Sequence, residues 1–156
     1  MPRRGAITPR AIEPDKRHNS RLVQQVINKV MVDGKKSTAE KIVYDALEQI
    51  SQKTANDPVI TLKKAVENVK PAIEVRSKRV GGAAYQVPMQ VNRTRQQSLA
   101  IRWIMAAIHE KKGRPTHESL ANELVAAYNR EGAAITRREN VHRMADANKA
   151  FAHFAW

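Results

Sequence analysis

Residues 74–91 read EVRSKRVGGAAYQVPMQV and form the one stretch beyond the first twenty residues that lacks a helical pattern of apolar residues. From residue 85 to residue 91, apolar side chains alternate with glutamine or proline, which is the period-two pattern of a strand with one apolar face. Residues 73–76 alternate in the same way before the Gly81-Gly82 pair. The segment 73–91 therefore predicts a β-hairpin with its turn at the two glycines.

The length of this turn decides which side chains share a face of the hairpin. A two-residue turn would place Arg76 and Lys78 on the apolar face of the second strand. A turn of three or five residues would instead group these cations with Gln86 and Gln90. We expect the odd turn, and with it a hairpin that is apolar on its inner face and cationic on its outer face.

Apolar residues recur with helical spacing on both sides of the hairpin. Ser37 with Glu40, and Thr136 with Glu139, match the S/T-x-x-E capping box at a helix start. The first twenty residues contain three prolines and no period, which indicates an extended arm. The expected fold is mostly α: a single six-helix domain over 21–156, with one protruding β-hairpin at about 73–91 and a basic extended N-terminal arm over 1–20. The expected helices cover about residues 22–31, 37–50, 58–69, 99–108, 116–128 and a last segment from 136 onward.

The composition indicates a folded protein with a polyanionic partner. Of 156 residues, 28 are Lys or Arg and 15 are Asp or Glu, so that the net charge is +13 and the pI is about 10.4. Hydrophobic residues make up 42%, which is enough for a core. Cysteine is absent, which excludes disulfides and thiol catalysis. No long apolar run or signal-peptide pattern occurs, so we expect a cytoplasmic protein without a membrane partner.

The positive charge is unevenly distributed along the chain. Residues 1–21 and 71–95 each carry a net charge of +4, whereas residues 116–156 are neutral overall. Clustered cations are typical of a surface that contacts phosphates. Aromatic residues make up only 4%, which argues against recognition by stacking of single-stranded bases. A folded RNA is the polyanion that this pattern favours.

No pattern of a catalytic, metal or cofactor site is present. The five histidines include no H-E-x-x-H pair, the string DGKKS at 33–37 lacks the other parts of a phosphate-binding loop, and no G-x-S-x-G motif occurs. We therefore expect no enzyme activity, no cofactor and no metal. Tyr85 is expected to pack at the hairpin rather than to stack on a base. The terminal Phe151, Phe154 and Trp156 either cap the bundle or contact a partner.

Four segments carry a resemblance to a known family. They read INKVMVDGKKSTAEKIVYDALE (27–48), ENVKPAIEVRSKRVGGAAYQVPMQV (67–91), RQQSLAIRWI (95–104) and RRENVHRMADANKAFAH (137–153). From about residue 20 to 153 the chain resembles the bacterial-type small-ribosomal-subunit protein seven family. The resemblance implies a ribosomal protein that binds the head domain of small-subunit ribosomal RNA and nucleates head assembly. It also implies a position near the exit-site tRNA and the mRNA path, with neighbouring small-subunit proteins as partners, in the cytoplasmic ribosome.

The resemblance also implies which side chains face RNA. Two segments depart from the family pattern, DKRHNS at 15–20 and the end of FAHFAW at 151–156, so the path of the arm and the contacts of the tail are left open. A DNA-architectural protein with a basic β-arm is the alternative, and a nucleic-acid-modifying enzyme lacks the carboxylate or histidine cluster it would need. The implied RNA-binding residues are Arg3, Arg4 and Arg10 in the arm, Lys35 and Lys36 between helices, Arg76, Lys78 and Arg79 in the hairpin, and Arg93, Arg95 and Arg102 beside it.

Overall fold

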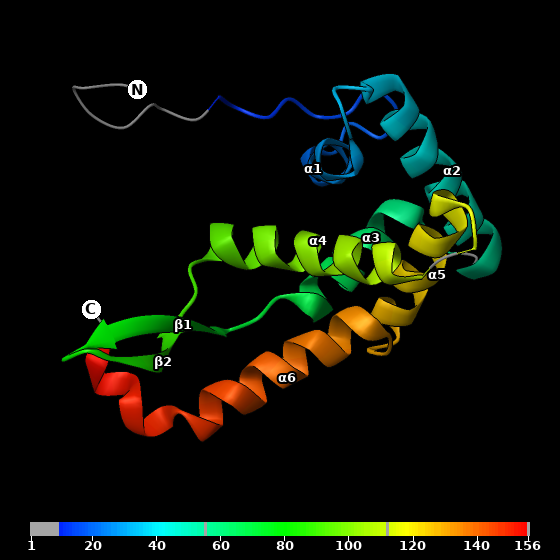
Figure 1. The fold of residues 1–156 in the computed structure, drawn as a ribbon. Coiled ribbons are helices and arrows are strands. Elements are labelled where there is room, and N and C mark those ends of the chain that lie inside the picture. Colours follow the sequence, from blue (N-terminus) through cyan, green and yellow to red (C-terminus); the bar gives the residue numbers. More distant parts are fainter. Residues whose placement is uncertain (1–9, 55, 112, 156) are drawn as a thin grey trace.

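The computed structural model describes residues 10–54, 56–111 and 113–155, and it confirms a mostly helical fold with one β-hairpin (Figure 1). Arg3 and Arg4 lie outside the described residues. The elements follow the order predicted from the sequence, with a short 3₁₀ helix added at the end. They are α1 (Arg21–Val30), α2 (Lys36–Thr54), α3 (Pro58–Val69), β1 (Ile73–Val80), β2 (Ala83–Gln90), α4 (Arg93–Glu110), α5 (Thr116–Tyr128), α6 (Ala133–Ala147) and η1 (Lys149–Phe154).

Three helices begin at side-chain caps that the sequence places directly before them. Ser20 accepts a hydrogen bond from the backbone N–H of Val23, and Asp57 accepts one from Val59 at 2.7 Å. Asn92 caps α4 by accepting from the backbone N–H of Arg95 at 2.9 Å. These contacts satisfy backbone donors that have no partner inside the helix.

The two predicted capping boxes are wrong. Helix α2 begins at Lys36, before Ser37, and α6 begins at Ala133, before Thr136. The start of α6 is capped instead by the buried Glu123 of α5, whose Oε1 accepts from the backbone N–H of Ala134 at 2.9 Å. Its Oε2 accepts from Lys111 Nζ at 2.6 Å, so the buried carboxylate has a charged partner.

The core lies among α1 to α5, with the first turn of α6 at its edge. Helix α5 packs against both α2 and α3, and α4 crosses the middle of the molecule (Figure 1). Trp103 of α4 is 7% exposed and belongs to this core, as predicted. None of the described helices is both long and apolar enough to cross a bilayer.

The hairpin turn has two residues, so the prediction of an odd turn is wrong. Gly81 and Gly82 have φ values of +57° and +90°, as in a type I′ turn, and Val80 pairs directly with Ala83. In this register Arg76 lies opposite Val87 and Lys78 lies opposite Tyr85. Opposed residues of an antiparallel pair point to the same face, so these two cations share the apolar face.

The polar partners of the two cations explain why this register is stable. The inward face packs against α6 and η1, with Val87 buried and Tyr85 half-buried. Arg76 pairs with the Glu74 carboxylate, and Lys78 Nζ donates to the backbone carbonyl of Phe154 at 2.9 Å. Long cationic side chains can pack their aliphatic stems on an apolar surface while the charged ends find polar partners. The positive charge of Arg76 and Lys78 therefore did not predict correctly on which face of the hairpin they lie.

Candidate nucleic-acid interface

The described part of the N-terminal arm is anchored to α2 by a loop around Asp15. This side chain is 2% exposed, and its carboxylate accepts from the backbone N–H groups of Arg17, His18 and Ser20. Burial opposes the charged form, but the three N–H donors outweigh it and hold the pKa of Asp15 below its ordinary value. The Arg17 guanidinium lies 5.0 Å from the centre of the Tyr44 ring. These contacts therefore hold the end of the arm, directly before α1, against α2.

Beside this loop the arm forms a groove with α1 and the start of α2. The groove has a volume of about 390 Å³ and is lined by Arg10 and Lys16 of the arm and by Lys36 of α2. Glu13 and Glu40 also line it, and Glu40 lies 3.8 Å from Lys36 Nζ in an exposed ion pair. Exposed pairs of this kind are weak, so Lys36 can turn toward an external phosphate at little cost. Two of the predicted cations, Arg10 and Lys36, are thus brought together.

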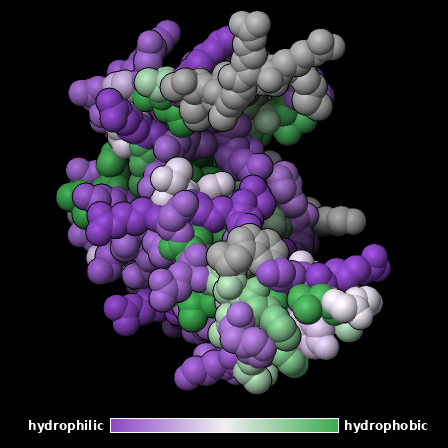
Figure 2. Space-filling view, turned by 90° about the vertical axis from the view of Figure 1, so that its left-hand side faces the viewer, coloured by the Kyte–Doolittle hydropathy of each residue, from purple (hydrophilic) through white to green (hydrophobic). Residues whose placement is uncertain are grey.

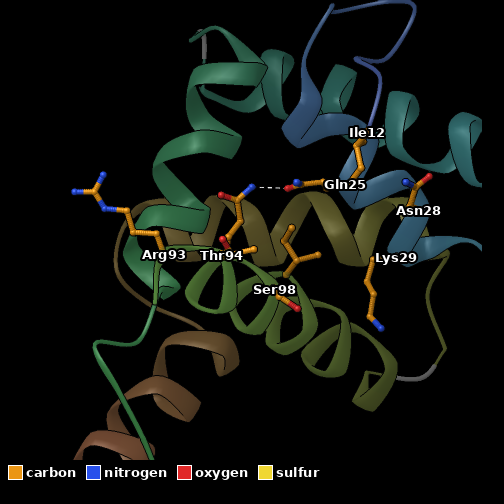
Figure 3. A pocket seen from close by; sticks show the side chains of 9 residues that line it. Ile12, Gln25, Asn28, Lys29, Arg93, Thr94 and Ser98 are labelled. Atoms are coloured by element: carbon orange, nitrogen blue, oxygen red, sulfur yellow. Dashed lines mark hydrogen bonds between the residues drawn. The ribbon is translucent and has the colours of Figure 1, made fainter. Parts of the chain in front are cut away.

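A second groove lies between the arm, α1 and the first turns of α4 (Figure 3). Its volume is about 460 Å³, and its charged lining residues are Lys29 and Arg93, with no carboxylate among the lining side chains. Ile12 and Asn28 belong to the lining of both grooves, so the two grooves adjoin. The full lining consists of Ile12, Gln25, Asn28, Lys29, Arg93, Thr94, Gln97, Ser98 and Ile101.

The start of α4 and the hairpin lie at the left of Figure 1, and the described part of the arm begins above the start of α4 in this view. Figure 2 looks onto this side, and hydrophilic residues cover most of it. Hydrophobic residues gather toward its lower end, at the height that the hairpin and η1 have in Figure 1. The start of α4 and the hairpin thus share this side of the molecule, with the hairpin at the lower level.

The hairpin cations differ from one another in what they contact. Glu74 is 9% exposed, and its carboxylate pairs with Arg76 and, at 3.2 Å, with Arg95 of α4. Lys78 is held by the η1 carbonyl described above. Arg79 lies on the opposite face, is exposed, and has no hydrogen-bond or charge partner among the described residues. The predicted cationic outer face is therefore reduced to Arg79.

The sequence left open what the C-terminal phenylalanines contact, and the structure shows that they pack on the hairpin. Phe151 and Phe154 lie with ring centres 5.1 and 5.2 Å from that of Tyr85. The tail therefore covers the inward face of the hairpin rather than the end of the helical core. Tyr85 packs at the hairpin, as predicted, and Trp156 lies outside the described residues.

The remaining predicted cations are exposed. Lys35 lies in the turn before α2, and Arg102 lies on the outer side of α4, each without a partner among the described residues. The prediction missed Lys29, although a lysine in the last turn of a helix beside DGKKS was a usable signal. It also missed the neutral amides of the second groove, for which charge offers no signal. The described part of the chain contains no group of three His, Cys, Asp or Glu residues arranged to hold a metal.

The comparisons with known proteins now decide the family. The family model for ribosomal protein S7p/S5e matches residues 2–149. The chain belongs to this family. It is 60% identical to the small ribosomal subunit protein uS7 of Dictyoglomus thermophilum over the full length of both chains. The protein of the same name from Rhodopirellula baltica is 62% identical over 144 residues, which is 91% of this chain and 92% of the relative.

Membership in the S7p/S5e family confirms several predictions. The chain is a structural protein of the small ribosomal subunit and not an enzyme, and its place is the cytoplasmic ribosome. Binding to small-subunit ribosomal RNA and contact with neighbouring ribosomal proteins are consistent with this family. The relationship favours the ribosomal interpretation over the DNA-architectural alternative.

Proposed function

We propose that this chain is a primary binder of small-subunit ribosomal RNA that nucleates assembly of the subunit head. The observation that carries the proposal is the pair of adjoining grooves between the arm, α1, α2 and α4. They are lined by cations that have no buried partner and are supported by the rigid core. A preformed basic surface on a stable body can bind RNA before other proteins arrive, because it loses little conformational entropy on binding.

The finer placement near the exit-site tRNA and the mRNA path rests on the hairpin. Its tip extends beyond the helical core, and Arg79 is exposed there for an external phosphate (Figure 1). The proposed division of roles therefore assigns most of the ribosomal RNA affinity to the body and a peripheral contact to the hairpin tip. Arg3 and Arg4, which precede the described residues, are proposed to contact the same RNA as the grooves.

Two binding measurements test this function. The affinity of the full chain for a head-domain ribosomal RNA fragment should exceed its affinity for duplex DNA of equal length at the same salt concentration. The logarithm of the RNA affinity should fall with the logarithm of the salt concentration, with a slope magnitude of about 0.7 to 0.9 per phosphate contact. About six contacts would give a slope magnitude of about 4 to 5. Equal affinity for both nucleic acids, or a flat salt dependence, would refute the proposal.

A further inference from the structure

The groove between the arm and α4 has a feature that phosphate binding does not explain. Its two cations lie at its ends, and in Figure 3 their side chains extend outward on opposite sides. Between them the lining consists of amide and hydroxyl groups and two isoleucines. A surface built only for the sugar-phosphate backbone has no use for a recessed neutral centre.

The centre of the groove carries a fixed pair of amides. Gln97 Nε2 of α4 donates a hydrogen bond to Gln25 Oε1 of α1 (Figure 3, dashed line). This bond leaves Gln25 Nε2 as a donor and Gln97 Oε1 as an acceptor, neither with a hydrogen-bond partner among the described residues. Asn28 Oδ1 is likewise occupied by Gln24 at 2.8 Å, which leaves its amide nitrogen as a donor. Oriented donors beside an acceptor are the groups that read the edge of a nucleobase.

The walls of the groove suit the faces of a base. Ile12 is an exposed large hydrophobic residue, 38% accessible, and Ile101 is 6% exposed. An apolar side chain left open inside a polar groove gains stability when a flat apolar ligand covers it. The volume of about 460 Å³ lies within the range of about 300 to 1,000 Å³ of small-molecule sites. A single nucleotide fits these dimensions, whereas a base-paired segment does not.

We propose that this groove receives one unpaired nucleotide of the ribosomal RNA. Its base contacts Ile12 and Ile101, its edge bonds to the Gln25 and Gln97 amides, and its flanking phosphates meet Lys29 and Arg93. Extruded bases in loops and bulges are the usual targets of sequence-specific RNA recognition. Adenine is the base whose edge pairs best with a glutamine amide, so it is the expected occupant. The inference rests on the proposed function and adds a source of sequence specificity to it.

The test combines changes in the RNA with changes in the protein. A head-domain ribosomal RNA fragment is prepared with a single abasic nucleotide at each unpaired position in turn. With the wild-type chain, one of these substitutions is expected to lower the affinity by about 5- to 100-fold, as for loss of one bidentate base contact. This half of the experiment needs no altered protein.

The protein half uses the double variant Gln25→Leu, Gln97→Leu, with Gln52→Leu on the exposed surface of α2 as the matched control. The double variant should bind the intact fragment with about the same loss as the abasic RNA causes. It should show no further loss with that abasic RNA, and its salt slope should be unchanged because no cation is removed. The control should behave like the wild-type chain.

Two outcomes would overturn the inference while leaving the proposed function intact. One is an abasic scan in which no unpaired position matters to the wild-type chain. The other is a sensitive position whose effect persists undiminished in the double variant. A wild-type chain that fails to prefer the ribosomal RNA fragment over duplex DNA would instead refute the proposed function itself.

Discussion

The body grooves and the hairpin carry similar charge in the sequence but use it differently in the structure. Along the grooves, Arg10, Lys29 and Arg93 have no charge partner among the described residues. In the hairpin, Arg76 is paired with Glu74, and Lys78 is bound to the tail. A cation that already has an internal partner gains less from a phosphate, because the internal contact must be broken first. The comparison teaches that clustered charge locates a basic region, whereas internal partners decide how much of it is free to bind.

The largest expected effect separates the two regions directly. Replacing Lys35 and three of the five cations that line the grooves by alanine should lower RNA affinity by on the order of 100- to 1,000-fold at about 0.1 M salt, with the slope magnitude reduced by about 3. The equivalent hairpin variant should lose about one contact, that of Arg79. The body variant is Lys29→Ala, Lys35→Ala, Lys36→Ala, Arg93→Ala, and the hairpin variant is Arg76→Ala, Lys78→Ala, Arg79→Ala.

Affinity is measured for both variants as a function of salt on the same head-domain ribosomal RNA fragment. Circular dichroism verifies that each variant keeps its helical content. If the hairpin variant lost as much affinity and slope as the body variant, the internal partners would not restrain the hairpin cations, and the comparison would fail.

The variant Glu74→Gln tests whether the ion pairs with Glu74 keep Arg76 and Arg95 from binding RNA. The substitution keeps the size of the side chain but removes the charge that holds Arg76 and Arg95. Two released cations should raise RNA affinity severalfold and increase the slope magnitude by about 1 to 2. The free energy of unfolding should fall by about 1 to 2 kcal/mol, because charge-assisted bonds at a nearly buried carboxylate are lost.

The control is Glu48→Gln on α2, where the carboxylate is exposed and has no charge partner among the described residues. It changes the net charge by the same amount without releasing a cation. An equal gain of affinity in both variants would mean that net charge, and not release of the arginines, is responsible.

Tyr85→Ala tests how the tail positions the hairpin. The ring contacts both phenylalanines of η1, and aromatic pairs contribute about 0.5 to 1.5 kcal/mol each beyond the buried area. Loss of these contacts should speed amide hydrogen exchange at residues 76–87 by about tenfold or more, while exchange in α2 and α5 is unchanged. Gln86→Ala on the exposed face is the control. Slow exchange that persists in Tyr85→Ala would show that the tail does not hold the hairpin.

The sequence predicts the helices and the hairpin well because their signals are local. Apolar spacing, Asp57 before Pro58, and the Gly81-Gly82 pair each act within a few residues. The errors arise where contacts cross the chain. The cap of α6 comes from Glu123 in another helix, and the polar partner that accommodates Lys78 on the apolar face is a carbonyl 76 residues away.

The candidate site shows the same division. Of the five cations that line the grooves, the family resemblance implied Arg10, Lys36 and Arg93 and missed Lys16 and Lys29. The amide pair escaped prediction because Gln25 and Gln97 lie 72 residues apart and are neutral. No local pattern marks a neutral donor and acceptor that meet only when α1 packs beside α4.

The smallest expected effect concerns the loop that anchors the arm to the body. The pKa of Asp15 is lowered in the fold, so its charged form contributes stability above the ordinary carboxyl value of 3.8, and this contribution is lost as the pH falls through the folded value. Asp15→Asn should lower the free energy of unfolding by about 1 kcal/mol at pH 7, because a neutral amide accepts weaker bonds from the three backbone donors. The difference from the wild-type chain should shrink steadily as the pH is lowered below about 4. Urea unfolding at a series of pH values measures it, with the exposed Glu13→Gln as the control of equal charge change. A stability difference that is independent of pH would show that the carboxylate charge does not hold the loop, and that the arm-side groove is kept in place by packing alone.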